Sequence, residues 1–428
     1  MVDEHRDENG NQNESSNGEL RQRRDARLHD KTTIQEKKAQ DLHSSPEYIW
    51  QPFPLSPFSE RLDWVLDLQS NFRGAIWSWR PAVFPSPPSQ ILTSLSKNSP
   101  SIRTNNMRLT NNSAHPHQLS AETTRRAVLL SNLKTLLVGY ILLDTLKFIM
   151  LYDPYFWGVT SITSPLPLSS PLPALIHNSA FLRKAYRLIA TQIGIFAALT
   201  TMFSLGPILY VSILPFFTSP RSRHDPWFYP PVYGPFLKSV SERGLAGWWA
   251  GWWHQTFRAG FSAPGDFMIK VLKLDRRGTV ARAIQVGGAF AASAVLHGCG
   301  SVTMIPETQP LRRMGMFFFW QWVGIVGEAV VERRGFVPAG MYRAWKGLPG
   351  WTKGLLRFVY VHAWFYYTAP LLCDDFAAGG LWLVEPVPVS FWRGVGYGVK
   401  GDERFWYWGG EWARWVQGKR WWLSGWGF

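Results

Sequence analysis

Cysteine is almost absent from this sequence, which has only Cys299 and Cys373 among 428 residues. Two cysteines in apolar surroundings exclude a disulfide framework and a cysteine-rich zinc site. Charged residues are also scarce, at 18% against about 25% in an ordinary globular protein. Tryptophan, in contrast, occurs 24 times, and aromatic residues make up 15% of the chain. This composition argues against two or three soluble domains of about 150 residues each.

The motifs of common soluble enzymes are missing as well. The sequence contains no dinucleotide-binding glycine motif, phosphate-binding lysine loop, nucleophile elbow or HExxH zinc motif. Of the ten histidines, five lie outside the polar N-terminal part, and none of these five has a partner at metal-binding spacing: His177, His224, His254, His297 and His362. A membrane di-iron enzyme would need many more histidines in close pairs. We therefore expect no bound metal or cofactor.

The net charge of +15 is unevenly distributed. Residues 1–125 contain 15 basic and 15 acidic side chains, whereas residues 126–428 contain 30 and 15. The excess of positive charge thus lies in the aromatic-rich part. A nucleic-acid-binding protein would carry it in a polar domain or tail. Basic loops between apolar, tryptophan-rich segments are typical of a polytopic membrane protein. The lipid bilayer is therefore the expected partner, and nucleic acid is not.

Composition divides the chain into four parts. Residues 1–46 are polar and too poor in large apolar side chains to offset their ordering entropy, so we expect disorder. No signal peptide is recognisable there. Residues 47–125 combine an aromatic segment with a linker rich in Ser, Pro and Asn, residues 126–398 form the predicted membrane domain, and residues 399–428 form an aromatic C-terminal tail.

Apolar segments predict the membrane spans. Five are long enough to cross a hydrocarbon core of about 30 Å, at residues 127–151, 189–217, 283–304, 314–331 and 356–373. Residues 376–398 are a weaker sixth candidate, interrupted by two prolines. The predicted fold class is an all-α polytopic membrane protein, a bundle of about five to seven transmembrane helices with an amphipathic tryptophan-rich interfacial helix.

Charged residues inside and between the spans add two expectations. Asp144 and Lys147 lie three apart in the first span, so they could pair on one helix face. Loops 218–282 and 332–356 are strongly basic, which predicts that both are cytosolic. The N-terminus is then cytosolic too.

A tryptophan-rich stretch near residue 250 is the first candidate for a functional site. Trp248, Trp249, Trp252 and Trp253 have the spacing that lines one side of a helix, and His254 and Arg258 lie four apart on an adjacent strip. Such a helix would lie in the membrane interface. The alternative interpretation is a tryptophan belt that anchors a loop, in which the histidine has no catalytic part.

His297 is the second candidate. It lies about 15 residues into an apolar span that otherwise lacks large polar side chains. A neutral imidazole, with an ordinary pKa near 6.5, is suited to take a proton from an alcohol. The alternative is a hydrogen-bonded packing residue.

These residues together resemble a known family. The runs YPPVYG from Tyr229 and WWAGWWHQTFR from Trp248, the basic segment 261–282, and SAVLHGCG from Ser293 are similar to the wax synthase-like branch of the membrane-bound O-acyltransferases. Within that branch they look more like the fungal terpenoid O-acetyltransferases. His254 and His297 lie 43 residues apart, as the family pattern requires, and FRGAIWSWRP at 72–81 resembles its Arg-Gly-x-x-Trp-x-Trp element.

The resemblance implies a mechanism and a set of site residues. His297 would deprotonate a substrate hydroxyl, which then attacks the thioester of acyl-CoA, and acetyl-CoA is the expected donor. His254, or Gln255 beside it, would orient the acyl group or stabilise the oxyanion. Other residues expected to contact the acyl-CoA or the apolar alcohol are Trp252, Trp253, Arg258, Lys270, Lys273, Arg276 and Arg277.

Alternatives remain open at this point. The basic residues fit CoA phosphates, but they equally fit the bias toward cytosolic positive charge. The expected product is an acetylated terpenoid or similar secondary metabolite made in the endoplasmic reticulum. A long-chain wax ester synthase is a second hypothesis. An inactive membrane scaffold is a third, because family members usually have further spans before the Arg-Gly-Trp element.

Overall fold

The computed structural model describes most of the chain after residue 124. The described residues are 2–4, 48–72, 74, 77, 80, 84, 87–98, 124–217, 222–304, 308–332, 338–409, 414–419, 421 and 424–427. Except for 2–4, the residues 1–46 predicted to be disordered fall outside these residues, as does most of the predicted linker. So do Arg73 and Trp79 of the Arg-Gly-Trp element.

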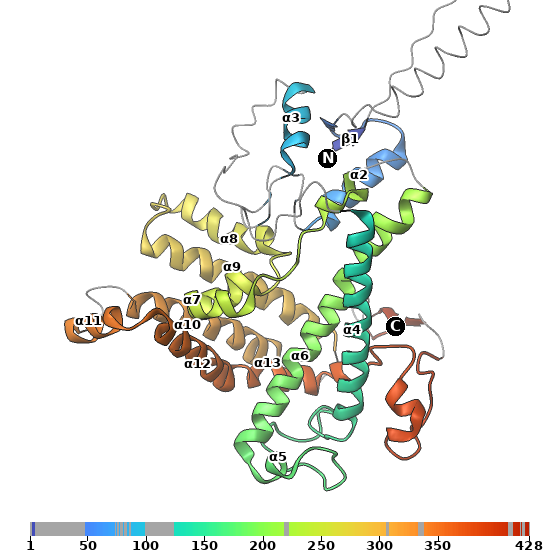
Figure 1. Ribbon diagram of the computed structural model, residues 1–428, viewed down its shortest axis with the longest axis vertical. Coiled ribbons are helices and arrows are strands. Elements are labelled where there is room, and N and C mark those ends of the chain that lie inside the picture. The colour runs from blue at the N-terminus through green and yellow to red at the C-terminus, as the bar shows by residue number, and fades with distance from the viewer. Residues whose placement is uncertain are drawn as a thin grey trace, which may run out of the picture. The chain divides into compact units, whose positions relative to one another are not determined.

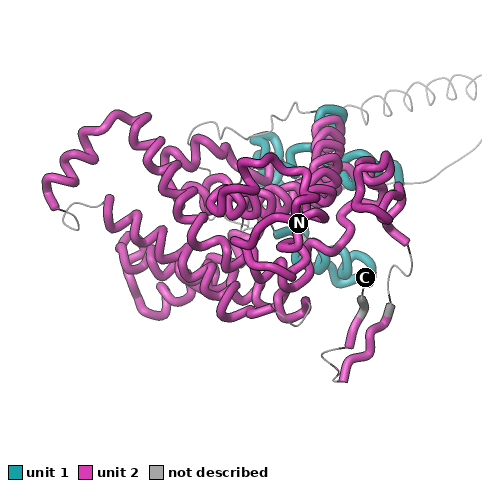
Figure 2. Tube along the Cα trace, turned by 90° about the horizontal axis from the view of Figure 1, so that it is seen from below, with its two compact units in different colours: residues 1–128, 209–230 teal, residues 129–208, 231–428 magenta. Residues whose placement is uncertain are grey.

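The described chain is mostly helical with very few strand residues, which confirms the predicted all-α class (Figure 1). Its strands are short antiparallel pairs: β1 (Val2–Glu4) with β2 (Tyr48–Trp50), and β3 (Arg414–Val416) with β4 (Gly425–Gly427). Two compact units are distinguished, residues 1–128 with 209–230, and residues 129–208 with 231–428 (Figure 2).

The first unit has a small aromatic core. Its helices are α2 (Phe58–Ser70) and α3 (Ser89–Asn98). It also contains two 3₁₀ turns from later in the chain, η4 (Ser222–His224) and η5 (Pro226–Phe228). The buried centre consists of Ile91, Leu95 and Phe228. Partly buried tryptophans pack around it: Trp64, Trp77 and Trp227. The aromatic segment after residue 47 is thus ordered against part of the long basic loop.

Four helices in the described ranges are long and apolar enough to cross a membrane. They are α4 (Arg125–Leu151), α6 (Ala180–Pro207) with its continuation through η2 (Ile208–Ile213) and η3 (Leu214–Phe216), α9 (Thr279–Val302), and η7 (Pro310–Gly315) followed by α10 (Met316–Val331). These helices coincide with the first four predicted spans, and the protein is an all-α polytopic membrane protein.

The last two predicted spans are divided differently. The segment 356–373 is shared between α12 (Gly350–Thr368) and α13 (Pro370–Ala378), which meet at Ala369 because Pro370 has no amide hydrogen to continue the first helix. The segment 376–398 forms no span. After α13 it contains only the short turns η8 (Leu381–Leu383) and η9 (Arg393–Tyr397).

Shorter helices connect the spans: α5 (Ala174–Asn178), α7 (Phe236–Gly247), η6 (Trp248–Trp252), α8 (Arg258–Val271) and α11 (Ala339–Gly347). α8 and α9 run side by side as a hairpin (Figure 1). Their backbones approach closely, since a Cβ on Gly288 would lie 2.6 Å from the backbone nitrogen of Gly265. Asp266 accepts a hydrogen bond from Gln285 at 3.1 Å across the same contact.

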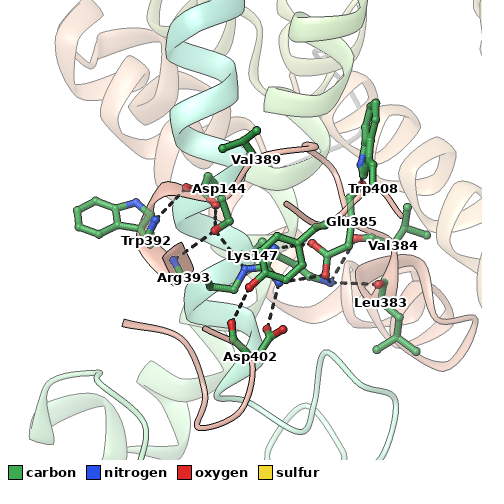
Figure 3. Close-up of polar contacts among 12 residues, drawn as sticks. Asp144, Lys147, Leu383, Val384, Glu385, Val389, Trp392, Arg393, Asp402 and Trp408 are labelled. Carbon is green, nitrogen blue, oxygen red and sulfur yellow. Dashed lines mark hydrogen bonds and ion pairs between the residues drawn. The ribbon is translucent and has the colours of Figure 1, made fainter. Parts of the chain in front are cut away.

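Asp144 and Lys147 do not pair with each other as predicted. Both are buried, and both bind the segment that follows α13 (Figure 3). The Asp144 carboxylate accepts from the hydroxyl of Ser390 and from the amide of Phe391 at 2.8 Å. It also accepts from the amide of Trp392 at 3.3 Å. These backbone amides have no helical partner of their own. Their hydrogen bonds to the Asp144 carboxylate therefore satisfy the amides and the buried charge together, which a pairing with Lys147 would not do.

Lys147 makes the complementary contact. Its ammonium donates to three backbone carbonyls, at 2.8, 3.1 and 3.2 Å from Trp382, Leu383 and Val384, and lies 3.6 Å from the Glu385 carboxylate. Buried Arg393 then pairs with Glu385 at 2.6 Å and with Asp402 at 3.2 Å. We call the five charged residues Asp144, Lys147, Glu385, Arg393 and Asp402 the charge clasp.

Candidate active site

The tryptophan-rich stretch is a short π-helical turn and not a long amphipathic helix. η6 ends at Trp252, and Trp253 takes an extended conformation with φ −56° and ψ 148°. α8 begins only at Arg258. The expectation that His254 and Arg258 lie on one strip of a single helix is therefore wrong.

The side chain of Gln255 accounts for this break. Its amide nitrogen donates to the carbonyl of Trp249 at 3.0 Å and to the carbonyl of Trp253. Its oxygen accepts from Arg258 at 2.7 Å. Gln255 is buried, so these bonds replace water for backbone carbonyls that the ended helix leaves unpaired. Both amide hydrogens of Gln255 are thereby committed to the turn.

The tryptophans of η6 pack into the protein interior. Trp248 is buried with Val240, Leu245 and Val361 in one core cluster. Trp249 lies against Phe290 at 5.5 Å between ring centroids and belongs to a second cluster built around that residue. The aromatic cluster that the sequence predicts is thus present, as part of the core of the second unit.

His254 is half-buried inside a ring of aromatic side chains. Its imidazole lies 5.2 Å from Trp253, 5.7 Å from Phe257, 5.9 Å from Phe203 and 6.2 Å from Tyr233, measured between ring centroids. Burial raises the pKa of Tyr233 to about 12, so this phenol stays protonated at neutral pH. The surroundings of His254 are therefore apolar walls with a neutral hydroxyl close by.

His297 occupies an open position on a packed helix face. Phe290, Ser293 and Ser301 share that face of α9 with it, at the spacing that a period of about 3.6 residues gives, and all three are buried. His297 lies between them and is nevertheless exposed. Its ring stacks on Phe318 of α10, at 5.0 Å between centroids and 19° between planes. One face of the imidazole thus lies against Phe318, while the side chain as a whole is exposed.

The next turn of α9 is closed. Ser301, four residues after His297, donates to the Asp375 carboxylate at 2.6 Å, and both residues are fully buried. The other oxygen of Asp375 accepts from the amide of Gln309 at 2.7 Å. This lock fixes the end of α9 against α13 and so limits how far His297 can move.

A row of aromatic rings links the two histidines. Trp249 lies 6.2 Å from Trp253 and 6.4 Å from Phe318 between centroids. Trp253 is the neighbour of His254, and Phe318 is the ring on which His297 stacks. Sequence reasoning did not single out Phe318, because it lies in the uninterrupted aromatic run 317–320, where no spacing distinguishes one ring from the next.

The predicted CoA-binding residues separate into two groups. Arg258 is tied to the turn through Gln255 and donates to the carbonyl of Ala250 at 3.2 Å. The other four are exposed in and before the α8–α9 turn and form no ion pair with a described carboxylate: Lys270, Lys273, Arg276 and Arg277. We call these four residues the basic turn. It adjoins the start of α9, so the rise to His297 from Thr279 is about 27 Å.

Metal ligands are not gathered near either histidine. No group of three or more His, Cys, Asp or Glu side chains that could hold a metal ion occurs in the part of the chain that the structure describes. The site therefore consists of two imidazoles on a shared aromatic cluster, one of them accessible, with a separate patch of cations at the far end of α9.

Comparison with known proteins finds the same segment. Residues 229–321, which include both histidines, match the model of the membrane bound O-acyl transferase family. Acetyltransferase ple2 of Rhodocybe pseudopiperita is 26% identical over 314 residues, which cover 73% of this chain and 65% of that protein. Acetyltransferase pyr8 of Aspergillus fumigatus is 29% identical over 149 residues, covering 33% of this chain and 31% of that protein.

A third relative, acetyltransferase ataH of Aspergillus terreus, is 26% identical over 197 residues, covering 43% of this chain and 58% of that protein. The chain thus spans less than two thirds of the length of each of these relatives. No solved structure matches it. The segment that matches the membrane-bound O-acyltransferase family contains His254 and His297, and the three relatives are fungal proteins named as acetyltransferases.

Proposed function

We propose that the protein is a membrane-bound O-acyltransferase that moves an acetyl group from acetyl-CoA to a hydroxyl of an apolar alcohol. One observation carries this proposal. The accessible histidine in the middle of a packed helix face lies in the segment that matches the O-acyltransferase family. A packing histidine would be covered like its neighbours on that face, whereas a base must be reachable by the proton that it takes.

In this reaction His297 acts as the general base. Its imidazole takes the proton of the substrate hydroxyl while the hydroxyl oxygen attacks the thioester carbonyl carbon. The carbon–sulfur bond then breaks, the ester is released, and the leaving CoA sulfur receives the proton from the imidazolium. The Phe318 stack holds the ring orientation without consuming a ring nitrogen in a hydrogen bond.

His254 is assigned to the acyl group. An imidazole N–H can donate to the carbonyl oxygen, where negative charge develops in the transition state. Gln255 does not share this role in our proposal, because both of its amide hydrogens bind backbone carbonyls. It positions the turn that carries His254. Trp252 and Trp253 form the adjoining apolar surface, which suits a bulky hydrocarbon substrate.

The cations of the basic turn are assigned to the CoA phosphates. They are exposed and unpaired among the described residues, so a phosphate need not displace an internal partner. Arg258 is not part of this patch, because its guanidinium donates to Gln255 in the turn. The basic character of this segment also supports a cytosolic location for it, and with it a cytosolic N-terminus, in the endoplasmic reticulum membrane.

All three relatives are named as acetyltransferases, which supports acetyl transfer over the transfer of longer chains. Terpenoid alcohols are the acceptor class that we propose. A wax ester synthase, which would join a long acyl chain to a fatty alcohol, is the second candidate. Microsomes containing the expressed chain, supplied with labelled acetyl-CoA or palmitoyl-CoA and a panel of alcohols, distinguish the two by which donor is consumed.

The base is tested by His297→Ala. We expect acyl transfer to fall at least about 100-fold, the usual contribution of general-base catalysis. His362→Ala is the matched control, because His362 is also exposed on a helix and lies against an aromatic ring, that of Phe358 at 4.1 Å. Transfer that survives His297→Ala as well as it survives His362→Ala would refute the assigned base.

A further inference from the structure

One face of α10 holds the segment that leads to His254. Glu328 and Gln321 lie seven residues apart on this helix and therefore on the same side. The two carboxylate oxygens of Glu328 accept from the amide of Leu245 at 2.9 and 3.0 Å, and one also accepts from the amide of Ala246 at 3.3 Å. These bonds join a span to the start of the tryptophan-rich turn.

A kink in α7 explains why a carboxylate is needed there. Gly244 has φ 56° and ψ −135°, which interrupts the helix and leaves the following amides without carbonyl partners one turn earlier. Such freed amides at a helix start favour a negative charge. The Glu328 carboxylate fills the space that a Cβ on residue 244 would occupy, so a larger residue at 244 would displace it.

Gln321 makes the second attachment. It is fully buried, accepts from the indole nitrogen of Trp249 at 3.4 Å, and donates to Thr368 at 3.0 Å. Between Gln321 and Glu328, a Cβ on Gly324 would lie 2.6 Å from the side chain of Leu245. The end of α7, which leads into the tryptophan-rich turn, therefore packs directly against the α10 backbone at this point.

The same face of α10 also holds the second histidine, because Phe318, on which His297 stacks, lies three residues before Gln321. We propose that Glu328 is a positioning residue that sets the register of the His254 turn against His297. The proposal rests on the acyl transfer proposed above. Glu328 lies outside the family-matched residues 229–321, and its hydrogen bonds go to the amides of Leu245 and Ala246, not to a histidine.

Glu328→Ala tests the inference, with Glu332→Gln as control. Glu332 is a carboxylate one turn further along, and its partner is Arg357 rather than the tryptophan-rich turn. In Glu328→Ala we expect amide hydrogen exchange of peptides covering 245–253 to accelerate about 10- to 100-fold, the range for losing a hydrogen bond to a charged group. Exchange in α4 and α6 should stay unchanged, which shows that the variant folds.

Activity supplies the second measurement. We expect kcat for acetyl transfer to fall about tenfold or more in Glu328→Ala, to recover partly in Glu328→Gln, which keeps one acceptor oxygen, and to remain at the wild-type value in Glu332→Gln. Gly244→Ala should reproduce the loss, because its Cβ displaces the carboxylate while leaving Glu328 in the sequence.

Two results would overturn the inference. Unchanged exchange at 245–253 in Glu328→Ala would mean that the carboxylate does not hold the turn. Faster exchange with unaltered kcat would mean that the turn is held for some purpose other than the reaction. A wild-type chain that transfers no acyl group would refute the proposed function instead, and the exchange measurement would still decide whether Glu328 holds the turn.

Discussion

The charge clasp and the basic turn contain the same types of side chain in opposite surroundings. In the clasp, Lys147 and Arg393 are buried, and each has carboxylate and carbonyl or hydroxyl partners. In the basic turn, Lys270 and Arg276 are exposed and lack ion pairs with the described carboxylates. Satisfied charges can only hold the chain together, whereas unsatisfied charges remain available to a ligand.

Arg393→Met should give the largest effect, on stability. Removing a fully buried guanidinium leaves Glu385 and Asp402 facing each other without their shared cation, and breaking a buried pair in this way costs about 3–5 kcal/mol. The free energy of unfolding in detergent, from a denaturant titration, measures it. Arg404→Met is the control, since Arg404, like Arg393, lies over the ring of Tyr407 but is exposed. Equal losses of unfolding free energy in the two variants would show that the buried ion pairs of the charge clasp do not stabilise the protein more than an exposed arginine does.

The basic turn should respond in the opposite way. Arg276→Gln combined with Arg277→Gln should leave stability within about 0.5 kcal/mol, as is usual for surface substitutions. It should raise KM for acetyl-CoA about fivefold, corresponding to two exposed ion pairs with phosphate. The difference in KM between this double variant and the wild-type chain should become smaller as salt is added. Arg343→Gln with Lys346→Gln removes two exposed cations elsewhere and should leave KM unchanged. A KM rise in this control pair would point to net charge alone.

An exposed ion pair should give the smallest effect and sharpen the contrast. Glu332 is 44% exposed and its partner Arg357 is 21% exposed, so solvent screens their attraction. Glu332→Gln should cost less than about 1 kcal/mol of unfolding free energy in the same titration. A loss approaching that of Arg393→Met would show that pairing, and not burial, determines the value of these charges.

Apolar run lengths were sufficient to predict most of the fold. Spans such as α4 and α9 follow from their composition because a membrane helix satisfies its own backbone and needs only apolar side chains. Local periodicity failed where a side-chain cap decides the structure. The helical spacing of His254 and Arg258 looked continuous, but η6 ends at Trp252 and Gln255 caps the turn that follows. Helical spacing alone does not reveal such a cap.

In the candidate site, too, some residues could be found from the sequence and others only from the packing of the helices. The types and spacing of His254 and His297 pointed to both residues, whereas the parts supplied by α10 could not be found in the same way. Phe318 is one of several adjacent aromatics, and Glu328 resembles any acid near the end of a span. Their importance arises only from contacts with residues about 20 and 80 positions away in sequence, which depend on how helices pack.

The clasp also has a consequence for biosynthesis. Asp144 finds its serine partner 246 residues later in the chain, and Lys147 finds its first carbonyl 235 residues later. At roughly 5–20 residues per second, ribosomes need about 12 to 50 s to make that intervening length. During this interval α4 carries two charges that its eventual partners cannot yet neutralise. The newly made span must wait beside water or helper proteins until the end of the chain arrives.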